Sequence, residues 1–313
     1  MSVRSPFANV AAVLARIVIP RPPVVFYLGT HRPGWLVDPR FRGVPLFVSR
    51  ASLAGMRRLP RALTRWAADS GGFTELHLHG RWTITPAAYV DELRRFRDEI
   101  GRLAWAAPMD WMCEPEILAK TGKTVDQHQR RTVDNLLALR ALAPDLPIIP
   151  VLQGWSVVDY WRCEELYDKA GVDLRAEPIV GVGTVCRRQN TMQAGTILRT
   201  LAHDGLRLHG FGFKTQGLLA CADVLASADS LAWSFAARRE PPLPGHEQPG
   251  PGRRTGHKHC NNCAEFALAW REDLLARLHV TAPDALARPA RPARSYFATV
   301  AELLAPPAFR RTA

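Results

Sequence analysis

The chain has 313 residues, of which 47% are hydrophobic and 22% are charged. This composition supplies one large core or two small ones, and it excludes a mainly disordered, collagen-like or coiled-coil chain. No uninterrupted apolar run reaches the roughly 18 residues of a membrane span, so we expect neither a membrane partner nor a signal peptide. Lys and Arg outnumber Asp and Glu by 41 to 29, a net charge of +12. This excess favours a polyanionic partner, although a genome rich in G and C would also encode many arginines.

Short apolar runs alternate with longer amphipathic ones through most of the chain. We expect strands at residues 24–30, 45–49, 75–79, 103–109, 148–153, 179–185, 208–213 and 230–233. We expect helices at residues 86–100, 125–142, 159–170, 191–203 and 264–278. Gly, Pro and Asp turn signals separate these segments.

This alternation predicts an α/β fold with a parallel sheet, and the apolar strands indicate helices on both faces or around a closed ring. Two architectures fit, an open doubly wound sheet and a closed (β/α)8 TIM barrel. No GxGxxG follows the first strand, and polar residues recur at the carboxyl ends of the strands. Both observations favour the barrel, whose active site is built from those ends.

Composition also divides the chain. Residues 1–239 are expected to form the barrel, and 240–281 a zinc-binding loop and helix packed on it. Residues 240–255 are rich in Pro, Gly and Arg, as linkers are. The Ala/Pro/Arg-rich residues 282–313 are expected to be a tail.

Cysteine usage predicts a reducing compartment, the cytoplasm, and one metal site. Four of the six cysteines are scattered among apolar residues, whereas Cys260 and Cys263 form a CxxC beside histidines. The spacing His257-x-x-Cys260-x-x-Cys263 is typical of a structural Zn²⁺ site with four protein ligands. His246, His259 and His279 are the alternatives for the fourth ligand.

Polar motifs lie at the ends of several expected strands or next to them. They are Asp69-Ser70-Gly71-Gly72-Phe73, Met109-Asp110-Trp111, Leu152-Gln153-Gly154, Gly181-Val182-Gly183-Thr184, His209-Gly210-Phe211-Gly212 and Ser227-Ala228-Asp229-Ser230. A carboxylate at the end of a buried strand is costly unless it is paired or binds a ligand. Several carboxylates at one face suit glycosidic chemistry, in which one attacks the anomeric carbon and another moves protons. The alternative is that some of them cap helices.

Taken in this order, the motifs resemble those of the tRNA-guanine transglycosylase superfamily, over residues 24 to 280. DSGGF is the most specific of them. Within the superfamily the chain looks most like the DpdA-type deazapurine DNA-modification proteins, through residues 26–31, 44–49 and 232–234 and through Asn262-Cys263. The resemblance implies a (β/α)8 barrel with a zinc site, and exchange of guanine in DNA for a 7-deazaguanine such as 7-cyano-7-deazaguanine.

The resemblance also implies roles for individual residues. Asp229 stands at the position of the nucleophile that forms a covalent glycosyl-enzyme intermediate, and Asp69 at that of the general acid/base. Asp110 and Gln153 would read the polar edge of the base. Substrate contacts are also expected from Ser70, Phe73, Gly181 and Gly183. Arg187, Arg188, Arg238 and Arg239 are candidates for phosphate contacts.

The choice between nucleic acids rests on departures from the tRNA-acting pattern. DSGGF is followed by Thr74-Glu75, the Cys-x-Cys-x-x-Cys arrangement is missing, and no RNA-binding domain is appended. We therefore expect DNA, with the target base flipped out of a duplex or presented single-stranded. A tRNA substrate, a hydrolase and a non-enzymatic zinc-containing nucleic-acid-binding protein are the alternatives. A homodimer and partner proteins of a DNA-modification system also fit this interpretation.

Overall fold

The sheet of this chain contains eight parallel strands that curl into a TIM-like arrangement. The structure is a computed structural model, and it describes residues 24–185, 192–247 and 258–281. The strands are β1 (Val25–Thr30), β2 (Leu46–Ser49), β3 (Trp66–Asp69), β4 (Leu103–Ala106), β5 (Val151–Leu152), β6 (Val180–Val182), β7 (Leu208–Gly210) and β8 (Leu225–Ser230). Their order is β4-β3-β2-β1-β8-β7-β6-β5, and an isolated parallel bridge between Ala106 and Ile148 connects the two outer strands.

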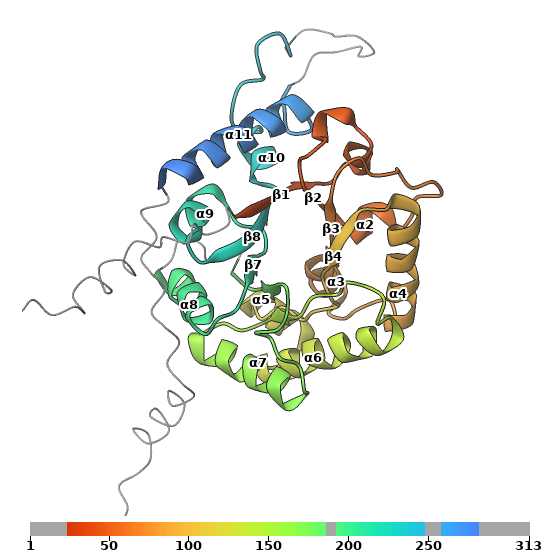
Figure 1. The fold of residues 1–313 in the computed structure, drawn as a ribbon, viewed down its shortest axis with the longest axis vertical. Coiled ribbons are helices and arrows are strands. Elements are labelled where there is room, and N and C mark those ends of the chain that lie inside the picture. The colour runs from red at the N-terminus through yellow and green to blue at the C-terminus, as the bar shows by residue number, and fades with distance from the viewer. Residues whose placement is uncertain (1–23, 186–191, 248–257, 282–313) are drawn as a thin grey trace, which may run out of the picture. The chain divides into compact units, whose positions relative to one another are not determined.

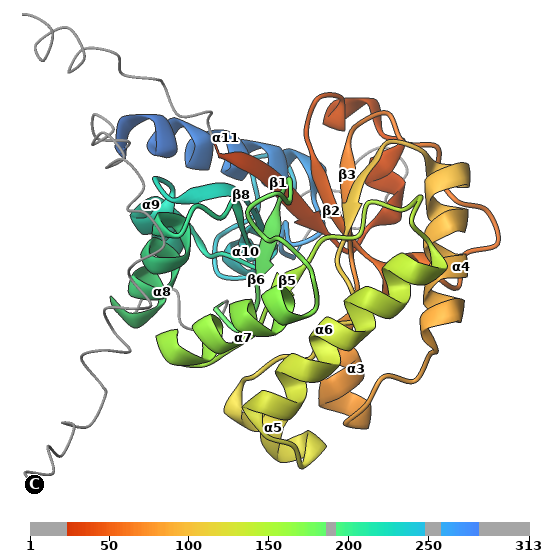
Figure 2. The same ribbon diagram turned by 60° about the horizontal axis from the view of Figure 1, so that its bottom comes forward.

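Helices accompany this sheet, and most of them surround its outer side (Figure 1). They are α2 (Arg50–Leu53), α3 (Gly72–His79), α4 (Pro86–Arg95), α5 (Pro115–Thr121), α6 (Val125–Leu142), α7 (Val157–Lys169), α8 (Met192–His203), α9 (Thr215–Cys221), α10 (Ala232–Ala236) and α11 (Ala264–Thr281), and a π-helical turn at Phe96–Ile100 extends α4. Figure 2 shows α6 and α7 crossing the outside of the sheet. The α/β class and its parallel strands agree with the prediction from the sequence.

Local sequence signals explain where the long helices begin. The Thr124 side chain accepts a hydrogen bond from the backbone N–H of Gln127, and the Gln127 side chain accepts one from the backbone N–H of Thr124. This capping box starts α6. Ser156 and Asp159 form the same arrangement at the start of α7. α4 begins with Pro86, which needs no backbone hydrogen bond at that position.

Two hydrophobic layers result from the alternation of side chains along the strands. The main core lies between sheet and helices, and includes Phe26 and Leu28 of β1. Tyr27, between them in sequence, belongs instead to a smaller cluster on the inner side of the sheet, with Phe47, Ala67, Trp105 and Ile149. The site described below is built above this inner cluster.

The last described helix shares the main core. Phe266, Ala267 and Leu274 of α11 are buried in it, and α11 contacts α9 and α10. The predicted boundaries at residues 239 and 281 stay predictions, and the predicted tail lies outside the described residues. Among the helices that the structure describes, none is long and apolar enough to cross a bilayer.

Two strand assignments from the sequence were wrong. Residues 75–79 alternate like a strand but lie in α3, which is bounded by Gly71 and Gly80, both with positive φ. The third strand is Trp66–Asp69, which is too short to give a pattern of its own. The last strand is Leu225–Ser230 rather than residues 230–233. Its inward-facing Ser227 and Asp229 conceal it, because they replace the apolar residues expected in a buried strand.

Candidate active site

Four predicted polar residues stand at the carboxyl ends of four strands. Asp69 ends β3, Asp229 lies one residue before the end of β8, and Asp110 and Gln153 follow β4 and β5. The carboxyl ends of the strands share one face of a TIM-like sheet, the face where the active sites of such folds lie. The structure therefore brings all four residues to one face.

Asp69 is a half-buried carboxyl whose pKa is raised toward neutral pH. Its carboxylate receives hydrogen bonds from the Ser49 hydroxyl and from the backbone N–H of Gly71, which has a φ of 75°. These bonds lower the pKa. Burial, followed by the nearby charge of Asp229, outweighs them and raises the pKa of Asp69 to about 6. A carboxyl of this kind can accept or donate a proton near neutral pH.

Asp110 and Gln153 form a buried pair. The Gln153 Nε2 donates to Asp110 Oδ2 over 2.6 Å, and Ser70 Oγ donates to Asp110 Oδ1 over 3.3 Å. Burial and the charge of Asp69 raise the pKa of Asp110 to about 7, against the lowering effect of these hydrogen bonds. The pair presents a carboxylate acceptor beside an amide donor, which is the complement of a base edge carrying both donors and acceptors.

Thr184 fixes the orientation of the Gln153 amide. Its hydroxyl lies 2.7 Å from Gln153 Oε1 and 3.2 Å from Glu114 Oε2, and accepts from the Cys113 backbone N–H at 2.9 Å. With the amide oxygen held by this hydroxyl, Nε2 is directed to Asp110. Thr184 has a φ of 57°, a strained conformation for a β-branched residue, as found at functional sites.

The glycines of the GVGT motif make room for side chains of the protein itself. A Cβ on Gly183 would overlap the Gln153 amide and come within 2.6 Å of its Cδ. A Cβ on Gly181 would lie 2.5 Å from the Phe211 ring. We predicted that both glycines let backbone groups approach a ligand, and that role stays a prediction.

Asp229 is a buried carboxylate held through one of its two oxygens. Oδ1 accepts a hydrogen bond from the Gly212 backbone N–H at 2.9 Å and lies 3.3 Å from His209 Nε2. On the other side of the imidazole, Nδ1 lies 2.7 Å from Ser227 Oγ. Among the described residues, no hydrogen bond to Oδ2 is found, so this oxygen is available to a substrate.

The predicted stacking and phosphate-binding residues are less closely tied to this site. Phe73 is half-buried at the start of α3 and stacks with His77 at a centroid distance of 5.5 Å. Arg238 and Arg239 are exposed after α10, where the guanidinium of Arg239 lies 3.8 Å from the Phe235 ring centroid. The predicted contacts of Arg187 and Arg188 lie outside the described residues.

A cluster of one imidazole and two thiols has the geometry of a zinc site. His246, Cys260 and Cys263 have ligand atoms within 4.8 Å of one another, and His246 Nδ1 lies 3.5 and 3.6 Å from the two sulfurs. A tetrahedral zinc ion, with bonds of about 2.3 Å to sulfur and 2.0 Å to nitrogen, separates these ligand atoms by about 3.5 Å. The residues therefore fit the predicted ion.

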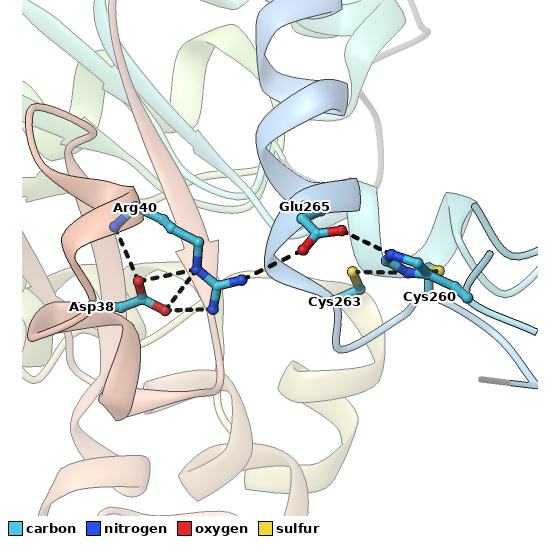
Figure 3. Close-up of polar contacts among 6 residues, drawn as sticks. Asp38, Arg40, Cys260, Cys263 and Glu265 are labelled. Atoms are coloured by element: carbon cyan, nitrogen blue, oxygen red, sulfur yellow. Dashed lines mark hydrogen bonds and ion pairs between the residues drawn. The ribbon is translucent and has the colours of Figure 1, made fainter. Parts of the chain in front are cut away.

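The surroundings of the cluster support the same interpretation (Figure 3). His246 Nε2 lies 2.8 Å from Glu265 of α11, and the other oxygen of Glu265 faces Arg40 at 3.8 Å. A carboxylate on the far nitrogen of an imidazole is the usual way in which a metal-binding histidine is oriented. Of the predicted ligands, His257 lies outside the described residues. His259 is exposed and is not part of the cluster.

A cavity of about 600 Å³ lies at the opposite ends of the strands. Its lining includes Val25 at the start of β1, and Arg65 and Arg207, which precede β3 and β7. None of the predicted catalytic or base-reading residues lines it. The predicted site residues therefore lie at the other face of the sheet.

Sequence reasoning gave no role to His209, Ser227 or Thr184. The motifs that contain them were recognised, but their contacts depend on the register between neighbouring strands. One signal was present: Ser227 and Asp229 are two residues apart and therefore share a face of the strand. The strand register pairs His209 of β7 with Ser227 of β8, and this places His209 beside Ser227 and Asp229.

Comparison with known protein families identifies a match. A family model described as DpdA, DeoxyPurine in DNA protein A, matches residues 24–299. This segment includes every described strand and all four residues of the carboxyl-end site. No curated protein matches the chain.

Proposed function

We infer that this chain, which belongs to the DpdA family, is a DNA-guanine transglycosylase that replaces guanine in DNA by a 7-deazaguanine. The family description places its members in deoxypurine modification of DNA. The observation that carries the specific chemistry is the site at the strand ends. A buried carboxylate with one oxygen available, Asp229, shares a face with Asp69, a carboxyl whose pKa is raised to about 6 by burial.

The exchange takes two displacements at C1′ of the target nucleotide. In the first, Asp229 attacks C1′, the bond from C1′ to N9 of guanine breaks, and its electron pair leaves with N9, which takes a proton from Asp69. In the second, N9 of the incoming base gives its proton to Asp69 and attacks C1′. The electron pair of the ester bond then returns to Asp229. One base has replaced the other, and both carboxyl groups have recovered their starting states.

Asp110 and Gln153 are suited to reading the base. Guanine and 7-deazaguanines both carry N–H donors at N1 and N2 and an acceptor at O6. The Asp110 carboxylate would accept from the donors, and Gln153 Nε2, directed by Thr184, would donate to O6. Adenine carries the opposite pattern at this edge and would leave buried groups unpaired.

The zinc ion is proposed as structural. His246, Cys260 and Cys263 would hold it, together with a fourth ligand. The ion would neutralise the thiolates and cross-link His246, in the segment after α10, to the two cysteines that immediately precede α11. The catalytic steps above use none of these residues.

DNA would reach the site with its target base extruded from the stack. The net charge of +12 and the exposed Arg238 and Arg239 support binding of the phosphate backbone. Arg187 and Arg188 are proposed for the same role. The same chemistry on tRNA would use the same four residues, so the experiment must distinguish the two nucleic acids.

The test is a base-exchange assay on purified protein, read by mass spectrometry of the nucleosides. Double-stranded DNA, single-stranded DNA and tRNA are each offered with 7-cyano-7-deazaguanine. We expect the deazaguanine deoxynucleoside in DNA, and a protein–DNA adduct that survives denaturation when the incoming base is left out. Asp229→Asn should abolish both, whereas Asp168→Asn, an exposed change on α7, should abolish neither.

The other outcomes contradict parts of the proposal. Incorporation into tRNA alone would overturn the substrate and keep the mechanism. Abasic DNA with no incorporation would indicate a hydrolase. Exchange at the normal rate by Asp229→Asn would show that the nucleophile is another residue.

A further inference from the structure

A histidine lies at the centre of the inner side of the sheet, in contact with the proposed nucleophile. His209 of β7 is fully buried. Its ring is surrounded by four aromatic side chains at centroid distances of 4.6 to 6.1 Å, namely Trp105, Phe211, Phe47 and Tyr27. Such an environment offers no water to an imidazole, so each ring nitrogen needs a partner within the protein.

Both nitrogens have one, and the partners determine where the proton lies. Nε2 faces Asp229 Oδ1 at 3.3 Å, and an ionised carboxylate can only accept, so Nε2 carries a hydrogen. In the neutral ring Nδ1 is then an acceptor, and the Ser227 hydroxyl at 2.7 Å is its donor. The hydrogen bonds run in one direction, from Ser227 through His209 to Asp229.

This arrangement makes the two oxygens of Asp229 different. Oδ1 receives the Gly212 N–H at 2.9 Å and faces the N–H of His209. Within the described part of the chain, Oδ2 receives neither of these bonds nor any other. A carboxylate with one oxygen anchored by two donors has a fixed plane, and its second oxygen points in one direction.

We propose that His209 is a positioning residue for the glycosyl transfer, and that Ser227 fixes its tautomer. The proposal rests on the proposed function. Asp229 Oδ2 forms the bond to C1′ as guanine leaves with the electron pair of the C1′–N9 bond. Oδ1 becomes the carbonyl oxygen of the ester and keeps both donors. When N9 of the incoming base attacks C1′, the electron pair of the C1′–Oδ2 bond returns to the carboxylate.

The donors on Oδ1 act most strongly in the second displacement. There the carboxylate is the leaving group, and negative charge grows on its oxygens as the ester bond breaks. In the first displacement the same donors hold the attacking group in line but also stabilise its starting charge. Loss of the His209 N–H should therefore slow release of the intermediate, by about 10- to 100-fold for one hydrogen bond to a charged group.

Two substitutions at one position separate the hydrogen bond from the packing. His209→Leu removes both nitrogens and keeps an apolar side chain in the aromatic surroundings. His209→Gln keeps an N–H near the place of Nε2. We expect His209→Leu to lower kcat by about 10- to 100-fold with little change in the KM for DNA, and to accumulate the covalent adduct. His209→Gln should recover most of kcat. The control is His203→Gln, an exposed change on α8.

A measurement that needs no turnover tests the same contact. In protein labelled with ¹⁵N-histidine, the ring signals of His209, identified from their loss in His209→Gln, should show the Nε2–H tautomer. Ser227→Ala should bring in the other tautomer, and Asp229→Asn should shift the Nε2 signal. These spectra test the positioning role whether or not base exchange is detected. Absence of base exchange would count against the proposed function alone.

Three results would overturn the inference. One is wild-type kcat and adduct levels in a folded His209→Leu protein. Another is equal loss in His209→Gln and His209→Leu, which would make the role one of packing. The third is a His209 tautomer that does not respond to Ser227→Ala or Asp229→Asn.

Discussion

Asp110→Asn should make this protein more stable and inactive, and the gain should depend on pH. The wild-type carboxyl is buried, and its pKa is about 7 in the folded chain against 3.8 for the ordinary group. Between these two values the folded state binds the proton and the unfolded state does not. The contribution of Asp110 to the free energy of unfolding is therefore fully present below pH 3.8 and is lost as the pH rises toward 7.

The size of the effect follows from that interval. Each pH unit between the two pKa values removes about 1.4 kcal/mol from the free energy of unfolding. From pH 5 to about pH 7 the wild type therefore loses roughly 3 kcal/mol through Asp110, and nothing further above that. Asparagine cannot ionise, and its amide can still pair with Gln153 and Ser70. The variant should escape this loss.

The assay is urea unfolding of both proteins at pH 5 and pH 8. We expect the difference in unfolding free energy, Asp110→Asn minus wild type, to be more favourable at pH 8 by roughly 2–3 kcal/mol. Base exchange should be lost at pH 8, where the wild-type carboxyl is ionised, because an amide cannot accept from all the donors of guanine. Asp168→Asn, an exposed change, should give no such pH-dependent difference. The same difference at both pH values would refute the reasoning, as would a smaller one at pH 8.

Two further predictions concern the base-reading pair and the metal. Gly183→Ala should displace the Gln153 amide and lower kcat/KM by about 10²- to 10³-fold through two lost hydrogen bonds, measured by base exchange. Gly195→Ala, whose Cβ has space in α8, should leave kcat/KM unchanged, and equal values for both variants would contradict the assignment. Cys263→Ser should lose the zinc ion and lower the Tm by several degrees. Cys221→Ser should keep one zinc per chain by elemental analysis, and a metal-free wild type would count against the site.

The sequence predicted which polar residues share the carboxyl-end face better than it predicted the strands that carry them. Asp69, Asp110, Gln153 and Asp229 come together as expected, because the carboxyl ends of parallel strands share one face whatever the bounds of each strand. Asp69 was identified although β3 was missed, since its motif follows the strand and has a pattern of its own.

The contacts around these residues could not be predicted in the same way. The register between β7 and β8 shifts at His209, and the partner of a side chain in a neighbouring strand depends on that register. The metal site shows the same contrast between features set by neighbouring residues and contacts set by the fold. The spacing of Cys260 and Cys263 is local and readable, whereas the orientation of His246 by Glu265 appears only in the folded chain.

The base-reading pair, Asp110 and Gln153, also affects the junction between β4 and β5. An isolated bridge joins the sheet here, where the Ala106 N–H donates to the Pro147 carbonyl and the Ile149 N–H donates to the Ala106 carbonyl. The hydrogen bond from the Gln153 side chain to the Asp110 carboxylate connects the same two parts of the sheet and strengthens this junction. A bound guanine would form hydrogen bonds with both side chains and replace the bond between them. We expect the backbone amide of Ile149 to exchange with solvent at a different rate once a base is bound, so that the junction itself would register occupancy of the site.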